Sequence, residues 1–367
     1  MLDARAAVLL ERGADPVLTD VQIRSPQADE ILVRIDAVGI CHTDITVSAQ
    51  WSPPRLPMVF GHEGAGTVVQ AGPQARAEAG QPVVLTFASC GQCVRCRAGR
   101  PAYCDRATAL NLRGDRGDDA SALRMGGAPV FGGFFGQSSF ATHVLTRPSN
   151  TVLLADPIDP ALAAPLACSV QTGVGAVLNA LTAGPNDALV VYGAGSVGLS
   201  AVMGARIAGC RRIVAVDPIA QRRELAAELG ATATLDADLP DTSAEIVEHS
   251  AGAPTLAIDT TARPEVICAA LATLAPGGTL ALLGLGVQAA EMPVGLILAK
   301  GLRVQGVIEG DSEPHEFIPR LADWVRTGEL PVQELVRRYG FEGFPEAWAD
   351  AKSGRAVKPV LMMNGAP

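Results

Sequence analysis

A glycine-rich turn between an apolar run and an alanine-rich stretch constrains the fold of this chain more than any other feature. Residues 190–198 read Val-Val-Tyr-Gly-Ala-Gly-Ser-Val-Gly, which fits G-x-G-x-x-G between a strand and a helix. One glycine permits the tight turn, one lets a pyrophosphate approach the backbone, and one allows close helix packing. By itself the motif also fits an ordinary strand-to-helix turn. The residues expected to contact a dinucleotide are Gly193, Gly195, Ser196, Val197 and Gly198.

A carboxylate at the end of the next expected strand identifies the dinucleotide. Asp217 lies 19 residues after Gly198, where a carboxylate accepts hydrogen bonds from the adenosine ribose and repels a 2′-phosphate. NAD is therefore favoured over NADP. Arg222 and Arg223 follow closely and would soften this preference if they faced the ribose. We interpret them as part of a solvated helix face.

The hydrophobic periodicity changes near residue 170. Before it, short β-branched runs such as 31–35 and 66–69 alternate with Gly, Pro and Asp, which is typical of strands and loops. After it, apolar strands alternate with alanine-rich helices, which predicts a parallel sheet covered on both faces. The expected strands are 188–192, 213–216, 233–235, 256–259 and 279–283, and the expected helices are 197–208, 221–229 and 264–274. In the C-terminal tail we expect helices over 317–327 and 345–352 and a strand near 360–362, packed back on the first domain.

Length and charge exclude several classes of protein. The 367 residues favour two domains. A net charge of −9 argues against a nucleic-acid partner, since such binding needs a basic surface. The N-terminus is interrupted by charge, and the uncharged runs 188–205 and 266–290 contain glycines or Pro-Gly-Gly. We expect a cytoplasmic protein with no membrane partner.

Four cysteines with the spacing C-x2-C-x2-C-x7-C predict a metal site. Four thiolates within 15 residues can close a tetrahedral site around one zinc ion, which leaves no open position and makes its role structural. An iron–sulfur cluster and disulfides are the alternatives, and the chain offers neither an electron-transfer context nor a secretory signal. The four residues are Cys90, Cys93, Cys96 and Cys104.

Three further residues supply a second ligand set. Cys41, His62 and Cys168 each have an ordinary explanation when taken singly. Together they make Cys2His, the ligand set of a catalytic zinc ion that keeps its fourth position for water or substrate. We therefore expect two zinc ions in each chain.

These motifs, in this order, resemble the zinc-dependent medium-chain alcohol dehydrogenase family over essentially the whole chain. The similarity rests on GICHTD at 39–44, GHEGAG at 61–66, the four-cysteine lobe, Cys168 and the glycine motif. It implies an α/β architecture of two domains. A GroES-like β-barrel catalytic domain is expected over 1–169 and 309–367, with the zinc lobe at about 88–106, and a Rossmann NAD-binding domain over 170–308.

The resemblance also implies roles for single residues around the catalytic metal. Cys41, His62 and Cys168 match the zinc ligands. Glu63 matches a carboxylate that approaches the metal during ligand exchange, and Asp44 matches the group that orients the histidine ring.

Coenzyme contacts and the proton route follow from the same resemblance. Lys358 and His42 fall where relatives place basic residues near the coenzyme pyrophosphate, and Thr172 is expected to contact the coenzyme. Thr43 is the expected first proton acceptor. Many relatives end the relay in a histidine where this chain has Thr46, which is no base near neutral pH. Proton release is then expected through His42, water or bulk solvent.

Two segments narrow the substrate class. Residues 134–142 and 168–173 resemble the aryl (benzyl) alcohol dehydrogenase branch, which includes enzymes of allylic terpene alcohols. This implies reversible NAD-dependent oxidation of primary aromatic or allylic alcohols to aldehydes. No Arg or Lys cluster indicates a charged substrate, and Trp51 and Phe87 either line the cleft or belong to the core. The long loop between Cys104 and Phe135 favours a homodimer over a homotetramer.

Two alternative functions remain open from the sequence. One is a thiol-dependent formaldehyde dehydrogenase of the same superfamily. The other is a non-catalytic dinucleotide-binding protein, which the complete Cys41, His62 and Cys168 set disfavours because such a protein has no need of all three ligands.

Overall fold

The computed structural model describes residues 1–114, 121–239, 241–286 and 289–363. It divides into unit 1, Met1–Cys168 with Glu313–Pro367, and unit 2, Ser169–Ser312. The sequence places the second boundary at 308, before the short helix η7 (Glu309–Asp311). The structure puts η7 in unit 2 because Glu309 accepts hydrogen bonds from Gln171 and Thr172 of α5 (Ser169–Gly175).

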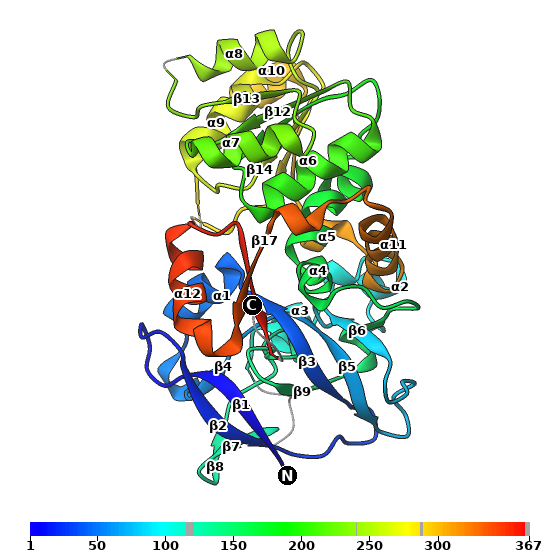
Figure 1. Ribbon diagram of the computed structural model, residues 1–367. Coiled ribbons are helices and arrows are strands. Elements are labelled where there is room, and N and C mark those ends of the chain that lie inside the picture. Colours follow the sequence, from blue (N-terminus) through cyan, green and yellow to red (C-terminus); the bar gives the residue numbers. More distant parts are fainter. Residues whose placement is uncertain (115–120, 240, 287–288, 364–367) are drawn as a thin grey trace. The chain divides into compact units, whose positions relative to one another are not determined.

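Unit 1 is built from two β-sheets (Figure 1). The first has the order β4-β1-β2-β7-β8, and the second has the order β10-β6-β5-β3-β18-β17 with β9 paired to β3. Residues 140–142 join the sheets: the Ala7 amide donates to the Phe140 carbonyl at 2.8 Å, and the Ile35 amide donates to the Thr142 carbonyl at 2.9 Å. The first sheet comprises β1 (Leu2–Leu9), β2 (Val17–Ile23), β4 (Met58–Val59), β7 (Leu123–Met125) and β8 (Ala128–Val130), and the second comprises β3 (Ile31–Gly39), β5 (Glu63–Ala71), β6 (Pro82–Leu85), β9 (His143–Thr146), β10 (Thr151–Leu153), β17 (Val336–Gly340) and β18 (Lys358–Met362).

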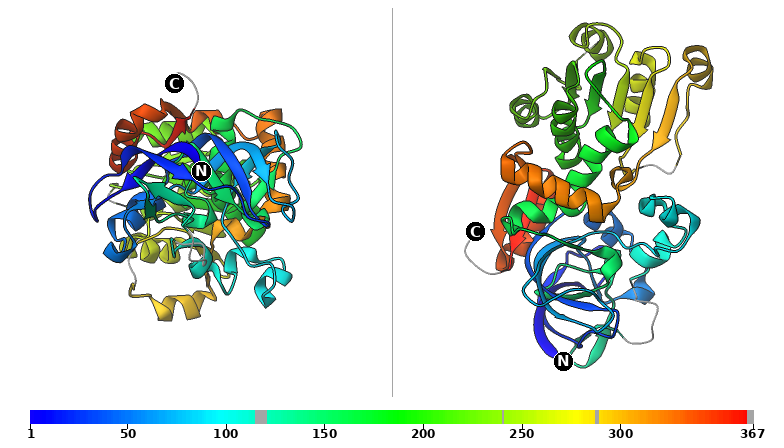
Figure 2. Two further views of the ribbon diagram at one scale, coloured as in Figure 1. Left: turned by 90° about the horizontal axis from the view of Figure 1, so that it is seen from below. Right: turned by 90° about the vertical axis from the view of Figure 1, so that its right-hand side faces the viewer.

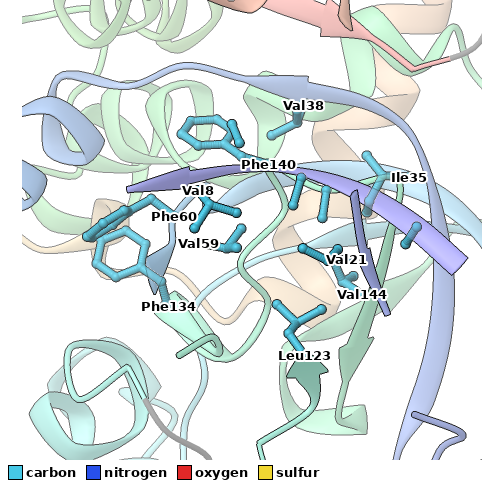
Figure 3. Close-up of a cluster of buried hydrophobic side chains, with 14 of the residues drawn as sticks. Val8, Val21, Ile35, Val38, Val59, Phe60, Leu123, Phe134, Phe140 and Val144 are labelled. Carbon is cyan, nitrogen blue, oxygen red and sulfur yellow. The ribbon is translucent and has the colours of Figure 1, made fainter. Parts of the chain in front are cut away.

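The core of unit 1 lies between these strands. Figure 3 shows Val8, Ile35 and Phe140 among the side chains that fill it. Each is fully buried, and each such side chain contributes roughly 1.5–3 kcal/mol of transfer free energy. The helix α12 (Phe344–Ser353) adds Phe344, whose ring centroid lies 5.4 Å from that of Phe140. The described residues of the first domain therefore share an apolar core.

The C-terminal tail returns to unit 1, as the sequence predicts. After α11 (Pro314–Thr327), β17 and β18 pair in parallel, and β18 pairs antiparallel with β3 through Val360 and Gly39. The strand β18 begins at Lys358, two residues before the predicted strand. This addition places Lys358 beside the segment that carries the catalytic ligands.

Unit 2 contains a parallel sheet, drawn from green to orange in Figure 2. It has six strands in the order β13-β12-β11-β14-β15-β16. Three strands coincide with the predicted ranges, because buried parallel strands form continuous apolar runs. The edge strand β16 and the helices α8 and α10 were not predicted. The sequences of β16 and α8 lack such runs, and the short apolar run 294–299 of α10 does not distinguish a helix from a strand. The strands are β11 (Ala188–Tyr192), β12 (Arg212–Val216), β13 (Ala233–Leu235), β14 (Leu256–Asp259), β15 (Thr279–Leu282) and β16 (Arg303–Gly306), and the helices are α6 (Ser196–Ala208), α7 (Ala220–Glu228), α8 (Thr242–His249), α9 (Pro264–Thr273) and α10 (Val294–Lys300).

The strand order reverses direction at β11. From β11 the chain moves outward through β12 to β13, then crosses to β14 and continues to β15 and β16. Right-handed crossovers put α6 and α7 on one face and α8 and α9 on the other. The carboxyl ends of β11 and β12 carry the glycine turn and Asp217. Ligands of doubly wound sheets bind at such a reversal.

The two long uncharged runs divide into separate elements. Residues 188–205 form β11 and most of α6, and 266–290 include α9 and β15, with 287–288 outside the described residues. No single helix of the described chain is long and apolar enough to cross a membrane. One pair, Pro160–Ala167 and Ser169–Ala180, passes the test of length and composition only when joined across a 58° bend.

Candidate active site

Asp44 organises the first part of the site. It lies in the first turn of α1 (His42–Ala49), where its Oδ2 accepts the Cys41 amide at 3.0 Å. Its Oδ1 accepts the Gly61 amide at 3.1 Å and the Nδ1–H of His62 at 2.9 Å. The carboxylate is fully buried, so these charge-assisted bonds hold the imidazole in one orientation. This arrangement fits the orienting role predicted for Asp44.

The remaining ring nitrogen of His62 faces the two cysteine thiols. Within the described chain, Nε2 of His62 is buried and has no hydrogen-bond partner. The ligand atoms of Cys41, His62, Glu63 and Cys168 all lie within 4.8 Å of one another. Two sulfurs and an imidazole nitrogen at this separation fit a zinc ion with one open position. The unpartnered nitrogen is explained by such an ion, because a buried polar atom without a partner costs about 1–3 kcal/mol.

The electrostatics of this cluster favour the deprotonated form of the Cys41 sulfur, which is the form that binds metal. A hydrogen bond with Cys168 and the positive charge of Lys358 hold the pKa of the Cys41 thiol well below its usual range, against the effect of burial. Burial alone lowers the pKa of His62, but the charge and hydrogen bond of Asp44 outweigh it and raise the pKa. The thiolate is the form that binds metal.

Glu63 forms a buried ion pair with Lys358. The Lys358 Nζ lies 2.8 Å and 2.9 Å from the two carboxylate oxygens, and both side chains are essentially inaccessible. A Cβ on Gly39 would lie 2.0 Å from Oε2 of Glu63, so only glycine fits beside the carboxylate. Burial raises the pKa of Glu63 to about 7, while the Lys358 charge opposes the rise. The metal approach predicted for Glu63 and the coenzyme contact predicted for Lys358 stay predictions.

The four-cysteine lobe forms a second compact sulfur cluster. The sulfurs of Cys90, Cys93, Cys96 and Cys104 lie within 4.8 Å of one another, around α2 (Val94–Arg97). The Cys93 amide donates to the Cys90 sulfur at 3.4 Å, and the Cys96 amide donates to the Cys93 sulfur at 3.5 Å. Backbone donors lower the pKa of Cys90 to about 6. None of the eight cysteines, all within the described residues, forms a disulfide. The donor set fits a closed tetrahedral zinc site.

The glycine turn in unit 2 has the geometry that a dinucleotide requires. Gly193 has a φ of +90°, and a Cβ on Gly198 would lie 1.8 Å from the Gly193 carbonyl oxygen. A Cβ on Gly195 would meet no atom within 4 Å. Ser196 and Val197 form the first turn of α6, directly after Gly195. Two glycines thus serve the fold, and Gly195 leaves space in front of the helix N-terminus for an anionic group.

Asp217 lies against this turn. Its Oδ2 accepts the Ala194 amide at 2.7 Å. The nearby arginines contradict the interpretation of a solvated helix face, because their side chains are only 21% and 19% exposed. Arg223 donates to the Asp217 carbonyl at 2.8 Å, and a guanidinium nitrogen of Arg222 lies 3.9 Å from the Asp217 carboxylate. The first turn of α7 therefore faces back toward the end of β12.

The remaining predicted residues lie as follows. The Thr43 Oγ1 is 3.6 Å from the Cys41 sulfur, and His42, beside it, is exposed. Thr172 lies on α5 in unit 2 and donates to Glu309 at 3.4 Å. Trp51 packs in the core of unit 1, with its ring centroid 5.2 Å from that of Phe60. Phe87 is also buried, 5% exposed.

Sequence reasoning missed the aromatic and amide groups around His62. The rings of Phe135 and Phe134 lie 4.6 Å and 5.8 Å from the imidazole centroid. The amide of Gln137 contacts the backbone on both sides of Glu63. Residues 134–142 identified a branch of the family in the sequence, but only the fold brings them to the metal ligands.

Comparison with known proteins defines the class. An alcohol dehydrogenase GroES-like domain model matches residues 27–156, and a zinc-binding dehydrogenase model matches residues 196–326. Geraniol dehydrogenase of Castellaniella defragrans is 43% identical over 366 residues, 98% of each chain.

Two solved structures agree over the whole length. An alcohol dehydrogenase zinc-binding domain protein from Burkholderia ambifaria has a TM-score of 0.95 at 40% identity, covering 99% of this chain and 100% of that one. Benzyl alcohol dehydrogenase from Acinetobacter calcoaceticus has a TM-score of 0.94 at 38% identity, with the same coverage. The chain therefore belongs to the zinc-dependent medium-chain alcohol dehydrogenase family. This family membership confirms the fold and the cofactors, zinc and NAD, that the sequence predicts.

A matched pair of substitutions tests the roles of the glycines in this turn. Gly195→Ala should leave the melting temperature near that of the parent, because its Cβ meets no atom, but weaken NADH binding about tenfold or more, equivalent to about 1.4 kcal/mol. Gly198→Ala should instead destabilise the protein by about 1–3 kcal/mol, because its Cβ overlaps the Gly193 carbonyl. NADH fluorescence titration and calorimetry separate the two effects. A Gly195→Ala protein with parental NADH affinity would contradict the assigned phosphate approach.

Proposed function

We propose that this enzyme oxidises primary aromatic or allylic alcohols, of the benzyl, cinnamyl or geraniol type, to aldehydes with NAD. The assembled ligand set carries the proposal: His62 presents an unpartnered nitrogen beside the sulfurs of Cys41 and Cys168. Two similar proteins, at 43% and 38% identity, are named for geraniol and for benzyl alcohol, whereas two relatives named for S-(hydroxymethyl)glutathione are only 27% and 30% identical. The rings of Phe134 and Phe135 against the imidazole support an apolar substrate.

The chain's own residues prepare the chemistry. When bound, zinc supplies Lewis acidity that lowers the pKa of an alcohol, and NAD supplies a hydride acceptor. Cys41, Cys168 and His62 would hold the metal, and Asp44 keeps the imidazole oriented and its Nδ1 protonated. Phe134 and Phe135 cover the imidazole and exclude water from that side.

The proton leaves through a short route. Thr43 is only partly buried, and its hydroxyl oxygen lies 3.6 Å from the Cys41 sulfur. This position suits Oγ1 to accept the proton of the alcohol while the hydroxyl gives up the proton it already carries. His42, exposed at the first position of α1 and next to Thr43 in the sequence, supplies an imidazole as the next proton acceptor. Thr46 lies one turn further along α1 and has no basic group.

A homodimer and a cytoplasmic location stay predictions. The homodimer is supported by the surface of unit 2. Val294 and Leu298, four residues apart on α10, are 70% and 82% exposed. The strand β16 forms the edge of the parallel sheet. Exposed apolar side chains on a helix next to an outer strand of a sheet favour association with a second copy.

The thiol-dependent and non-catalytic alternatives make different predictions for one experiment. NAD reduction is measured with benzyl, cinnamyl, geranyl and short aliphatic alcohols, and with formaldehyde in the presence and absence of glutathione. We expect kcat/KM for the aromatic and allylic alcohols to exceed that for ethanol by about 10²-fold or more, since each matched methylene contributes about 10–200-fold. NAD should also be preferred to NADP. A strict thiol requirement, or no turnover by zinc-loaded enzyme, would reject the proposal.

Variants of Thr43 and Thr46 test the proposed proton route. Thr43→Val should lower kcat/KM by about 10²–10⁴-fold, because the variant has the shape of threonine and no hydroxyl to relay a proton. Thr43→Ser should recover most of the activity, and Thr46→Val should change it little. Steady-state kinetics with a primary alcohol measure all three. A Thr43→Val enzyme with unchanged turnover would remove Thr43 from the relay.

A further inference from the structure

A single buried amide, that of Gln137, closes the end of a strand ladder beside the metal ligands. The pairing of β5 with β6 stops at Gly64 and Leu85. Beyond that point the Nε2 group of Gln137 donates to the carbonyls of His62 and Leu85, both at 3.0 Å, and of Thr86 at 3.1 Å. Gln137 is 2% exposed, so these bonds are shielded from water.

The other end of the same amide binds the same strand. The Oε1 of Gln137 accepts the Gly64 amide at 3.2 Å and the Ser139 hydroxyl. Since Nε2 binds the His62 carbonyl, one side chain engages the backbone on both sides of Glu63. This is the pattern by which a neighbouring strand would pair. A Cβ on Gly64 would lie 2.4 Å from the Ser139 oxygen, so glycine is required for this approach.

The connection continues from Thr86 to the third metal ligand. The Oγ1 of Thr86 donates to the Ala167 carbonyl at 2.9 Å, and Ala167 directly precedes Cys168. The Thr86 side chain is fully buried, and its amide is held by the Asn150 carbonyl at 3.0 Å. A chain of hydrogen bonds therefore runs from the backbone of His62 through Gln137 and Thr86 to the residue before Cys168.

We propose that Gln137 and Thr86 are positioning residues for the catalytic zinc ion, which set the separation of His62 and Cys168. Asp44 links Cys41 to His62 in the same way. With both bridges in place, three ligands from three distant segments are held before the metal arrives. Neither residue belongs to the cluster of ligand atoms, so both act through the backbone of the ligands.

A purely structural role makes a different prediction. If the bridge only satisfied buried carbonyls, its loss would lower stability and leave the metal site unchanged. If it positions ligands, its loss changes metal affinity and coordination geometry. The inference rests on the zinc site and not on the substrate proposed above, so the two experiments fail independently.

The test replaces Thr86 in the full-length, metal-loaded enzyme. Thr86→Val removes the hydroxyl at nearly constant shape, and Thr86→Ser restores it. Thr146→Val is the matched control: Thr146 is also fully buried in unit 1, where its hydroxyl bonds only to Thr151 at 2.6 Å among the hydrogen bonds the structure describes for that side chain. Gln137→Met tests the amide, and Cys168→Ser identifies which kinetic phase of metal release belongs to the catalytic ion.

The readouts are the rate of zinc release to a chelator, the visible spectrum of the cobalt-substituted enzyme, and the melting temperature. Thr86→Val and Gln137→Met should release the catalytic zinc about 10–100-fold faster and shift the cobalt bands. Thr86→Ser should return both toward the parent, and Thr146→Val should change only the melting temperature. Parental release and spectrum in Thr86→Val, or equal changes in Thr146→Val, would overturn the proposal. If Thr86→Val fails to fold, Thr86→Ala provides the same test without adding a methyl group.

Discussion

The active site depends on one buried carboxylate that has three N–H donors. Asp44 accepts the amides of Cys41 and Gly61 and the imidazole N–H of His62. A buried carboxylate without partners would cost several kcal/mol, so this geometry is strongly specified once the first domain folds. The orientation of the His62 ring follows from these bonds. The opposite nitrogen then faces the thiols, where a metal completes its coordination.

Close backbone approach makes this arrangement sterically possible. Gly39 leaves room for the Glu63 carboxylate, and Gly64 leaves room for Ser139 and the Gln137 amide. Gly39 and Gly64 thus let polar side chains pack against the backbone, while Gly198 packs a helix against a turn. Because glycine has no side chain, it permits the close contacts with the backbone that metal ligation needs in unit 1 and coenzyme binding needs in unit 2.

Much of the fold follows from periodicity, but the site depends on contacts that sequence spacing does not show. The strands 188–192, 233–235 and 256–259 were predictable because buried parallel strands are continuous apolar runs. The metal ligands were predictable because thiolates and imidazole have few other uses together. The pair between Lys358 and Glu63 joins residues 295 positions apart, and the Gln137 bridge to His62 joins residues 75 apart. Such contacts exist only when the C-terminal strand β18 pairs with β3 and the 134–142 segment lies against the start of β5.

The central claim is that the folded chain presents two metal sites with different coordination, one closed and one open. Diffraction from crystals at the zinc absorption edge measures this most directly. We expect two anomalous peaks per chain, one surrounded by the sulfurs of Cys90, Cys93, Cys96 and Cys104. The other should lie among Cys41, His62 and Cys168, with a fourth position occupied by a solvent or substrate atom. A single peak, or a second peak whose fourth ligand is a protein side chain in the alcohol-bound enzyme, would contradict the account.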